Sequence, residues 1–598
     1  MIFGKNVNHY YFKYFYLLLV GIMALLFVDY IQTLLPENYG NLVDAIKNSL
    51  ALKNDGIEPN NGLLLTKSFV IEIVINVLMI AIGMFVGRFL WRIAILNLGV
   101  NVETDLRKRM FLKMEMLSQD YFQLHKTGAQ MALYTNDLMC INSCFTDGII
   151  MFVDALFLGG IAIYKMLKLN VALTLFASIP LAIIGLCGGL IGKLIDKRFE
   201  ARQKSYEKLS DFAQENFSGL AVIKAFVKEK LELQEFVKNN KDFSKTNIAF
   251  TKLIVGLNVF FTALVSSIVV IIVGYGSHLI ITTKGMDTPF TSGSLITFIS
   301  YFGLLTWPAL ALGNLINLFS EGRASLRRIN ELLEYPILVK DQSDVIEDVD
   351  LVGEIEFRHL NFKYPGSDHE VLKDISFKIS KCEKVGIIGK TGCGKTTIVD
   401  LLTRIYNVDE GMLLIDGIDI MKLPIKKVRN LISYVPQDNF LFNTTILENI
   451  AFSRPKMETE EAIKYATYAS VDDNIQEFSH QYQTIIGERG VALSGGQKQR
   501  ISMARAMAKE SPILILDDSV SAVDTKTEAS ILKTLKEDFV DKTIILIAHR
   551  VSTIESLDKI ILMDNGRIVA CGKHEELYEN VPMYKDIVDL QKLEDGDA

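Results

Sequence analysis

The sequence predicts two parts: an α-helical bundle of six transmembrane spans, and a soluble α/β domain that follows it. The chain has 598 residues, which is long for one domain, and 49% of them are hydrophobic. In roughly the first 320 positions the hydrophobic residues form runs of about 20, the length that a helix needs to cross a bilayer. The rest of the chain alternates short apolar runs with turn-forming segments, which is typical of a soluble α/β protein.

The six predicted spans are long and numerous, which argues against helices of a soluble core. They lie at 14–36, 66–90, 147–167, 171–192, 252–283 and 292–320. We therefore expect a transmembrane domain at 1–330, a linker at 331–350 and the soluble domain at 351–598.

The distribution of basic residues predicts the orientation of the spans. Lysine and arginine gather between the second and third spans and between the fourth and fifth, whereas the other loops contain few of them. Because basic loops stay inside, both termini and the soluble domain are expected in the cytoplasm. The two basic segments are polar with helical periodicity, and each contains a candidate short contact helix, near 121–128 and 216–226.

Charge and cysteine content exclude several classes of protein. The net charge of −7 gives no basic signature of a nucleic-acid-binding protein, so no nucleic-acid partner is expected. The six cysteines lack paired C-x-x-C spacing, which argues against a structural zinc site or a disulfide framework. The apolar N-terminus lacks a convincing cleavage site and is interpreted as the first span.

A glycine-rich loop predicts a nucleotide site in the second domain. The stretch KVGIIGKTGCGKTTIVDLL matches G-x-x-x-x-G-K-[ST] between an apolar strand and a helix. Backbone N–H groups and the helix N-terminus would bind phosphates, the lysine would reach the β- and γ-phosphates, and the threonine after it would hold Mg²⁺. ATP and Mg²⁺ are thus the expected cofactors, and the loop residues expected to bind are Gly389, Lys390, Thr391, Gly392, Cys393, Gly394, Lys395, Thr396 and Thr397.

Three further motifs follow the loop at characteristic distances. LSGGQ occupies 493–497, the apolar stretch ILILDD ends at Asp517 and Asp518, and His549 follows the apolar stretch TIILIA. Together with the phosphate loop, this spacing resembles the ATP-binding cassette (ABC) transporters. With six spans before one cassette, the chain resembles an exporter half-transporter of the type IV fold over nearly its whole length.

The resemblance implies a role for each motif. Tyr364 would stack on adenine, although it could also be a buried strand tyrosine. Gln437 would sense Mg²⁺, so that the expected metal-binding residues are Thr396, Gln437 and Asp517. Ser494, Gly495, Gly496 and Gln497 would bind the γ-phosphate of a nucleotide held by the opposite subunit, and Ser521 and Asp524 would lie in the loop between cassettes. The residues expected to act in hydrolysis are Asp518, His549 and Gln437.

Asp518 departs from the family pattern, which has glutamate at this position. An aspartate carboxylate is one methylene shorter, and a misplacement of about 1 Å can reduce a rate by about 10²-fold. The chain therefore resembles the degenerate-site subunit of bacterial heterodimeric multidrug exporters (the LmrCD and BmrCD type), with a second half-transporter as its partner and the bacterial plasma membrane as its location. The retained His549 leaves open a slow homodimeric exporter of lipid or peptide. A third alternative is a regulatory subunit that binds ATP without transporting.

The spans suggest an amphipathic or cationic small-molecule cargo, in contact with membrane lipids. Aromatic residues on the last two spans could form a substrate wall, or could pack helices and face lipid: Phe260, Phe261, Phe298, Tyr301, Phe302 and Trp307. Asp29 and Asp154 lie within predicted spans, where each could attract a cation or pair with a neighbouring helix. Cys393 adjoins a helix N-terminus, which can lower a thiol pKa, and we expect its alkylation to block ATP binding and bound nucleotide to protect it. A structural role, in which the cysteine simply replaces serine, is the favoured alternative.

Overall fold

The computed structural model describes residues 4–596 except 56–63, 285–288, 488–492 and 521–522, and it leaves out the side chains at 54–55, 181–193 and 594–596. The chain divides into two compact units. Unit 1 comprises Met1–Phe111 and Met131–Leu333, and unit 2 comprises Leu112–Gln130 and Glu334–Ala598. The segment with the first predicted contact helix is thus grouped with the C-terminal unit. Each unit is described by itself.

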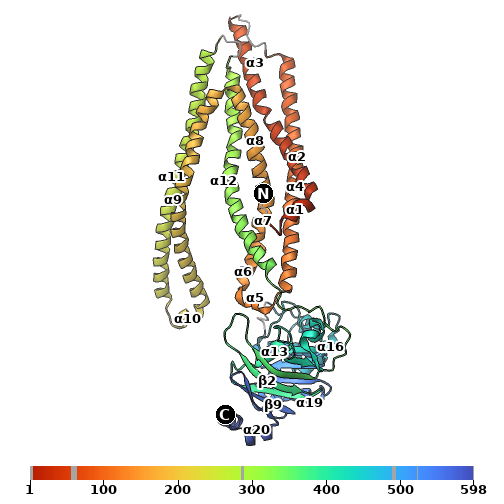
Figure 1. Ribbon diagram of the computed structural model, residues 1–598. Coiled ribbons are helices and arrows are strands. Elements are labelled where there is room, and N and C mark those ends of the chain that lie inside the picture. The colour runs from red at the N-terminus through yellow and green to blue at the C-terminus, as the bar shows by residue number, and fades with distance from the viewer. Residues whose placement is uncertain (1–3, 56–63, 285–288, 488–492, 521–522, 597–598) are drawn as a thin grey trace. The chain divides into compact units, whose positions relative to one another are not determined.

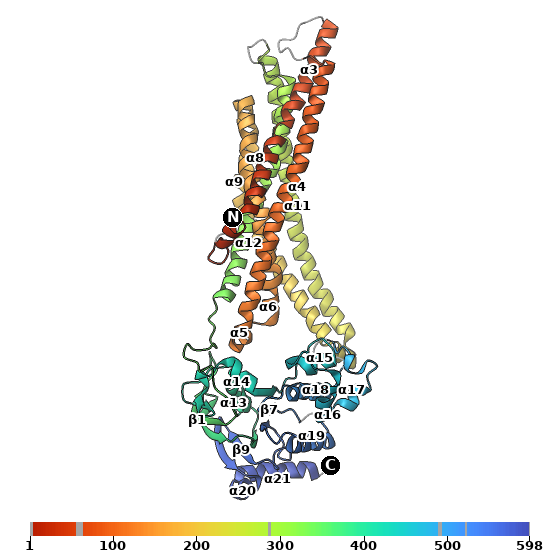
Figure 2. The same ribbon diagram turned by 90° about the vertical axis from the view of Figure 1, so that its right-hand side faces the viewer.

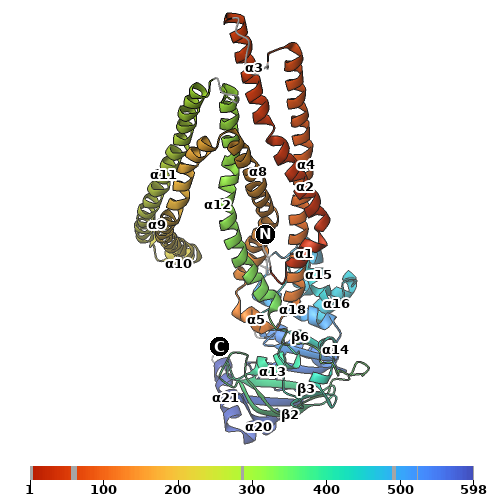
Figure 3. The ribbon, with the colours of Figure 1, turned by 45° about the horizontal axis from the view of Figure 1, so that its top comes forward.

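Unit 1 consists of helices (Figure 1). They are α1 (Asn8–Lys13), α2 (Phe15–Gln32), α3 (Leu35–Asp55), α4 (Lys67–Glu115), a π-helical turn η1 (Leu133–Asp137), α7 (Leu138–Phe145), α8 (Asp147–Leu169), α9 (Val171–Ser218), α10 (Leu220–Ala225), α11 (Glu229–Thr282) and α12 (Ser292–Glu334). The long helices α9 and α11 run side by side, and the short α10 joins their ends (Figure 3). Large apolar side chains at and beside α10 are exposed, among them Phe217 and Phe226.

Five helical segments among the described residues are long and apolar enough to cross a membrane. They are Phe15–Lys53, Lys67–Glu115, Thr127–Leu169, Glu229–Thr282 and Ser292–Glu334. These correspond to five of the six predicted spans. The remaining span, 171–192, lies within the continuous helix α9, but its described apolar part is the shorter Val171–Pro180, and the side chains at 181–193 lie outside the described residues. The count of six is therefore not confirmed.

Polar side chains fix the helix ends and crossings of unit 1. Asn170 separates α8 from α9, and its side-chain oxygen accepts a hydrogen bond from the Leu173 N–H at 2.9 Å, which caps the new helix. At the other end of the bundle, Arg328 of α12 forms an ion pair with the buried Asp137, and its Nε donates to that carboxylate at 3.0 Å. Because Asp137 belongs to η1, this pair attaches α12 to the start of the third span.

Unit 2 is built on two sheets. The antiparallel sheet has the order β2-β1-β4-β5, with β1 (Ile355–Phe362), β2 (Leu372–Ile379), β4 (Leu413–Ile415) and β5 (Ile418–Asp419). The six-stranded sheet has the order β10-β9-β3-β8-β7-β6 and is parallel except for the edge strand β10. Its strands are β3 (Lys384–Gly389), β6 (Ile432–Val435), β7 (Ile513–Asp517), β8 (Thr543–Ile547), β9 (Lys559–Asp564) and β10 (Arg567–Gly572).

The inner strands of the six-stranded sheet are buried on both faces. In β7, Leu514 and Leu516 belong to one hydrophobic cluster, whereas Ile513 and Ile515 belong to another. Side chains alternate between the faces of a strand, so a strand covered on both sides needs an unbroken apolar run. This explains why β3, β7 and β8 were identifiable in the sequence as continuous hydrophobic stretches.

Helices surround these sheets, and α15 to α18 gather on one side of the unit (Figure 2). The helices are α5 (Gln119–Leu124), α6 (Thr127–Ala132), α13 (Lys395–Leu402), α14 (Ile425–Leu431), α15 (Ile446–Ile450), α16 (Thr459–Tyr468), α17 (Asp472–Gln476), α18 (Gly495–Ala508), α19 (Thr525–Glu537), α20 (His574–Asn580) and α21 (Pro582–Gly596). Three 3₁₀ turns complete the unit: η2 (Ile420–Lys422), η3 (Ala451–Ser453) and η4 (Gln481–Gln483).

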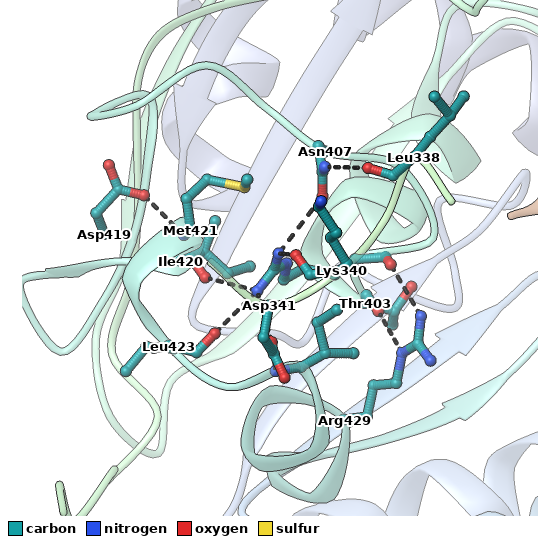
Figure 4. A network of polar contacts seen from close by, with 12 residues as sticks. Leu338, Lys340, Asp341, Thr403, Asn407, Asp419, Ile420, Met421, Leu423 and Arg429 are labelled. Carbon is teal, nitrogen blue, oxygen red and sulfur yellow. Dashed lines mark hydrogen bonds and ion pairs between the residues drawn. The ribbon is translucent and has the colours of Figure 1, made fainter. Parts of the chain in front are cut away.

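The segment that enters unit 2 after α12 is attached by a buried arginine. Arg404 is fully buried, and its guanidinium donates to the backbone oxygens of Leu423 at 2.8 Å and of Lys340 at 3.4 Å. Figure 4 shows these partners converging, together with Asn407, which donates to the Leu338 carbonyl at 2.9 Å. Because a buried charge needs several acceptors, this network determines the path of the chain between the predicted domains.

Candidate nucleotide-binding site

The phosphate loop, the Asp517–Asp518 pair and His549 meet at the carboxyl ends of β3, β7 and β8. The register aligns Ile387 of β3 with Ile547 of β8, and Ile547 with Asp517 of β7. In parallel sheets, ligands bind at the carboxyl ends of the strands. A cavity of about 270 Å³ lies here, lined by Tyr364, Val371, Thr391, Gly392, Gly394, Lys395, Thr396, Thr397, Gln437, Asp517, Asp518 and His549.

Glycines shape the phosphate loop between β3 and α13. Gly394 caps α13 with φ +100°, a left-handed conformation that side-chain-bearing residues rarely adopt. A Cβ on Gly389 would lie 2.3 Å from the Met563 carbonyl oxygen and 2.8 Å from the Cys393 sulfur. The loop therefore folds back tightly before the helix and presents its backbone at the N-terminus of α13.

Lys395 and Thr396 lie at the first turn of α13. The Lys395 ammonium is buried and donates to the carbonyl oxygens of Gly389 at 2.8 Å and Lys390 at 3.1 Å. The Thr396 hydroxyl donates to Asp517 Oδ2 at 2.8 Å. Burial raises the pKa of Asp517, and the hydrogen bond from Thr396 opposes that shift. A hydroxyl beside a carboxylate is the oxygen donor set that Mg²⁺ prefers.

Asp518 occupies a strained position directly after β7. Its φ is +49°, in the left-handed region, which aspartate tolerates better than most residues. The Gln437 amide approaches Asp518 Oδ2 at 3.4 Å, and buried Gln499 donates to the Asp518 carbonyl at 2.8 Å. The structure thus brings together Asp518, Gln437 and His549, the three residues expected to act in hydrolysis, around one cavity.

Tyr364 is both packed and part of the cavity wall. Its ring meets Phe362 and Tyr406 edge-on, with centroid separations of 5.2 Å each, and its hydroxyl lies 2.8 Å from Thr397 Oγ1. The alternatives of a packed strand tyrosine and a nucleotide-contacting tyrosine are therefore compatible. The ring remains at the edge of the cavity, as contact with a base would require.

The LSGGQ motif lies elsewhere in unit 2. Ser494 caps α18: its side chain accepts from the Gln497 N–H at 3.2 Å, and Gln497 Oε1 accepts from the Ser494 N–H at 2.9 Å. Ser494, Gly495, Gly496 and Gln497 are not among the described residues that line the cavity. Asp524 caps α19 through the Thr527 N–H, whereas Ser521 lies outside the described residues.

The expectation of a lowered Cys393 pKa is wrong. The side chain is buried, with 4% of its surface exposed. Burial raises the pKa of the thiol, and the positive charge of Lys395 only partly opposes that effect. The cysteine packs under the loop, against the position that a Gly389 Cβ would occupy.

Several residues around the site were missed by sequence reasoning. Tyr434 of β6 donates to Asp517 Oδ2 at 3.4 Å. Asp400 lies one helical turn beyond Thr396, and burial, followed by the charge of Asp517, raises its pKa to about 6. In the sequence, only the spacing of four residues from Thr396 could have placed Asp400 on this face of α13.

Gln591 of α21 holds the backbone on both sides of Arg550: it donates to the His549 carbonyl and accepts from the Val551 N–H, each at 2.7 Å.

Comparisons with known proteins match both units. The chain matches the family "ABC transporter transmembrane region" over residues 14–309 and the family "ABC transporter" over residues 372–521. It is 34% identical over 600 residues to the Bacillus subtilis protein YheI, described as a "Probable multidrug resistance ABC transporter ATP-binding/permease protein", and the match covers 99% of each chain. The chain belongs to the ABC transporter family.

Two further comparisons agree with this family assignment. It is 32% identical over 520 residues to the multidrug resistance-like ATP-binding protein MdlA of Escherichia coli, covering 87% of each chain. The solved structure of a bacterial Atm1-family ABC exporter with ATP bound superposes with a TM-score of 0.75 at 25% identity, over 98% of this chain and 99% of that chain. The protein is therefore a multi-pass membrane exporter with an ATPase domain that is coupled to transport.

Proposed function

We propose that this ABC transporter is the degenerate-site half of a heterodimeric exporter of amphipathic or cationic small molecules. The observation that carries the proposal is Asp518, where the family has glutamate, in a cavity that is also lined by Lys395 and Thr396 of the phosphate loop. The residues of the phosphate loop that would bind ATP are present. The side chain of Asp518, next to the expected γ-phosphate position, is one methylene shorter than the family's glutamate. ATP binding with slow hydrolysis follows, because phosphoryl transfer depends on positioning.

The composite nature of the sites supports a second subunit. LSGGQ caps α18 and does not line this chain's own cavity among the described residues. Our proposal pairs this chain's phosphate loop, Asp518 and His549 with the partner's signature motif. This chain's intact LSGGQ then completes the partner's site, which carries the glutamate. Mg²⁺ would be held by Thr396, Asp517 and Gln437, whose oxygen atoms suit it.

Two exposed apolar surfaces fit the same partner. The helix α10 and its flanks expose Phe217 by 78% and Phe226 by 69%. In unit 2, an aromatic patch of Phe440, Phe442 and Phe452 is 40–56% exposed beside a hollow of about 430 Å³. Contiguous exposed apolar side chains mark interaction sites. We propose that α10 docks on the partner's ATP-binding domain and that the aromatic patch receives the partner's equivalent helix.

The remaining parts of the proposal concern topology and cargo. Six spans, with cytoplasmic termini in a bacterial plasma membrane, agree with the basic loops and with the continuous helix α9. Relatives named for multidrug resistance support small-molecule cargo. Phe298 and Tyr301 are buried, so the substrate wall is assigned to exposed members of the aromatic set, such as Phe260.

Turnover with and without a partner tests this function. The full-length chain is purified alone and with a half-transporter that carries glutamate after its Walker B aspartate, and both are placed in lipid nanodiscs. We expect the chain alone to bind ATP and hydrolyse it slowly, and the pair to hydrolyse it rapidly. Brisk hydrolysis by a homodimer would overturn the heterodimer. If the pair hydrolysed ATP rapidly but moved no amphipathic dye in proteoliposomes, small-molecule export would be contradicted. The chain would then be a regulatory subunit or an exporter of another cargo.

A further inference from the structure

The transmembrane unit contains two buried carboxylates that the ATP-driven cycle does not use. Asp29 lies in α2 with 3% of its surface exposed, and Asp154 lies in α8 with 6% exposed. These two helices pack against each other. Both carboxylates therefore lie inside the bundle, on helices that pack together. Two negative charges buried in neighbouring helices of a bilayer core are costly unless another group compensates them.

Their hydrogen bonding is incomplete and unequal. The Trp307 indole N–H of α12 donates to Asp154 Oδ2 at 2.6 Å, but Asp154 Oδ1 is buried without a partner among the described residues. Asp29 Oδ2 is likewise buried without a partner in the described part of the chain. A donor to one carboxylate oxygen stabilises the ionised form. Asp154 is therefore the better carrier of negative charge, and Asp29 lacks the donors that an ionised form needs.

No cation compensates this pair among the described residues. Neither Asp29 nor Asp154 takes part in an ion pair of the described residues. The helix α4 packs closely on α2, where a Cβ on Gly87 would lie 2.5 Å from Val28 Cγ2. The other charged or titratable groups on the packed helices are exposed or engaged elsewhere: Arg88 and Arg92 on α4 are exposed, Tyr301 on α12 donates to the Thr33 carbonyl at 3.0 Å, and Lys165 pairs with Glu37 at 2.5 Å.

We propose that Asp29 and Asp154 form a proton-binding site between α2 and α8, with the proton on Asp29 and the negative charge on Asp154. The bound proton removes the repulsion between the two carboxylates. It also adds a hydrogen-bond donor in a region where Asp154 Oδ1 lacks one. Loss of the proton would place two negative charges between packed helices, so proton occupancy is coupled to the packing of α2, α8 and α12. The inference goes beyond ATP-driven export and does not depend on a heterodimer.

Infrared spectroscopy of the full-length chain in nanodiscs, without nucleotide or partner, tests the proton site. A protonated carboxyl group has a C=O stretching band that an ionised one lacks. We expect such a band at neutral pH, its loss on raising the pH, and its loss at neutral pH in Asp29→Asn. Asp154→Asn removes the repelling charge, so the Asp29 band should weaken at neutral pH. The matched control is Asp147→Asn, at an exposed position on the same helix, which should leave the band unchanged.

Each alternative outcome is distinct. A wild-type spectrum without a protonated-carboxyl band at neutral pH overturns the proposal before any variant is made. A band that survives Asp29→Asn assigns the proton to another residue. Disappearance of the band on adding Na⁺ or a cationic dye at fixed pH would show a cation site instead of a proton site. Because ATP turnover is not measured, failure here leaves the proposed export function unaffected.

Discussion

At the scale of single residues, the proposed separation of ATP binding from hydrolysis rests on one methylene group, at Asp518. The ATP cavity contains a phosphate loop, a buried lysine and a threonine–aspartate pair with a 2.8 Å hydrogen bond. None of these ATP-binding groups depends on the length of the side chain at position 518. In the proposed function the Asp518 carboxylate, in contrast, must reach an attacking water molecule. The Gln437 amide nitrogen lies 3.4 Å from its Oδ2, a long hydrogen bond.

The substitution Asp518→Glu should therefore raise the rate of ATP hydrolysis at this site, by up to about 10²-fold. Glutamate must adopt the same left-handed backbone, which costs about 1 kcal/mol, so a slightly lower melting temperature is expected. Turnover of the full-length chain with and without a partner is the measurement. Asp518→Asn is the matched control and should not accelerate hydrolysis. An unchanged rate in the glutamate variant would show that carboxylate length is not limiting.

Cys393 should react slowly with maleimides at neutral pH. Burial raises the pKa of its thiol, so the reactive thiolate is scarce below that pKa and becomes more abundant as the pH rises. The alkylation rate, measured by mass spectrometry of the Cys393 peptide, should be lower than that of a free thiol at pH 7 and should increase towards pH 9. Modified protein should fail to bind ATP, whereas Cys393→Ser should bind it normally. Fast labelling at neutral pH would contradict the burial argument.

At the scale of elements, the C-terminal helix α21 supports the loop that carries His549. Gln591 makes two hydrogen bonds of 2.7 Å to the backbone of this loop, one to the His549 carbonyl and one from the Val551 N–H. The histidine ring lines the cavity, but its backbone is held from outside the cavity. Positioning of His549 is thus shared between β8, which precedes it, and a helix about forty residues later.

We expect Gln591→Leu to slow single-turnover ATP hydrolysis by about five- to tenfold, because each lost hydrogen bond contributes about 1 kcal/mol. Nucleotide affinity, set mainly by the phosphate loop, should change little. Gln591→Glu keeps the acceptor for Val551 and should have a smaller effect. The control is Asp589→Asn on the same helix, since that side chain bonds Tyr578 instead. Equal losses of rate and affinity would indicate general unfolding of the domain.

The elements also show what can be predicted from a sequence. The strands β3, β7 and β8 were predictable because they are buried on both faces, and the phosphate loop because its glycines meet strict steric limits. Arg404 was not predictable, because a single arginine after a helix usually lies on the surface. Gln591 was missed because contacts between distant segments leave no local pattern. The raised pKa of the Cys393 thiol was missed because its position beside a helix N-terminus suggested a lowered pKa. Burial of the side chain outweighs that effect.

At the scale of the whole molecule, two features of the described residues support the proposed second subunit. The signature motif is separate from the cavity, and apolar side chains around α10 are exposed. Burial of a phenylalanine side chain contributes about 1.5–3 kcal/mol, so leaving these residues in water has a substantial free-energy cost. The proposed second subunit would account for both features.

Coupling between ATP hydrolysis and transport should therefore fail when the two exposed phenylalanines that flank α10 are removed. In the proposed complex, the double substitution Phe217→Ser and Phe226→Ser removes two exposed rings. We expect retained ATP binding, because the cavity in unit 2 is unchanged, but at least tenfold slower dye transport in proteoliposomes. Ala221→Ser, at an exposed position on the same helix, is the control and should transport normally. If the double variant transported dye at the wild-type rate, α10 could not be a required docking element, and the partner would have to engage a different surface.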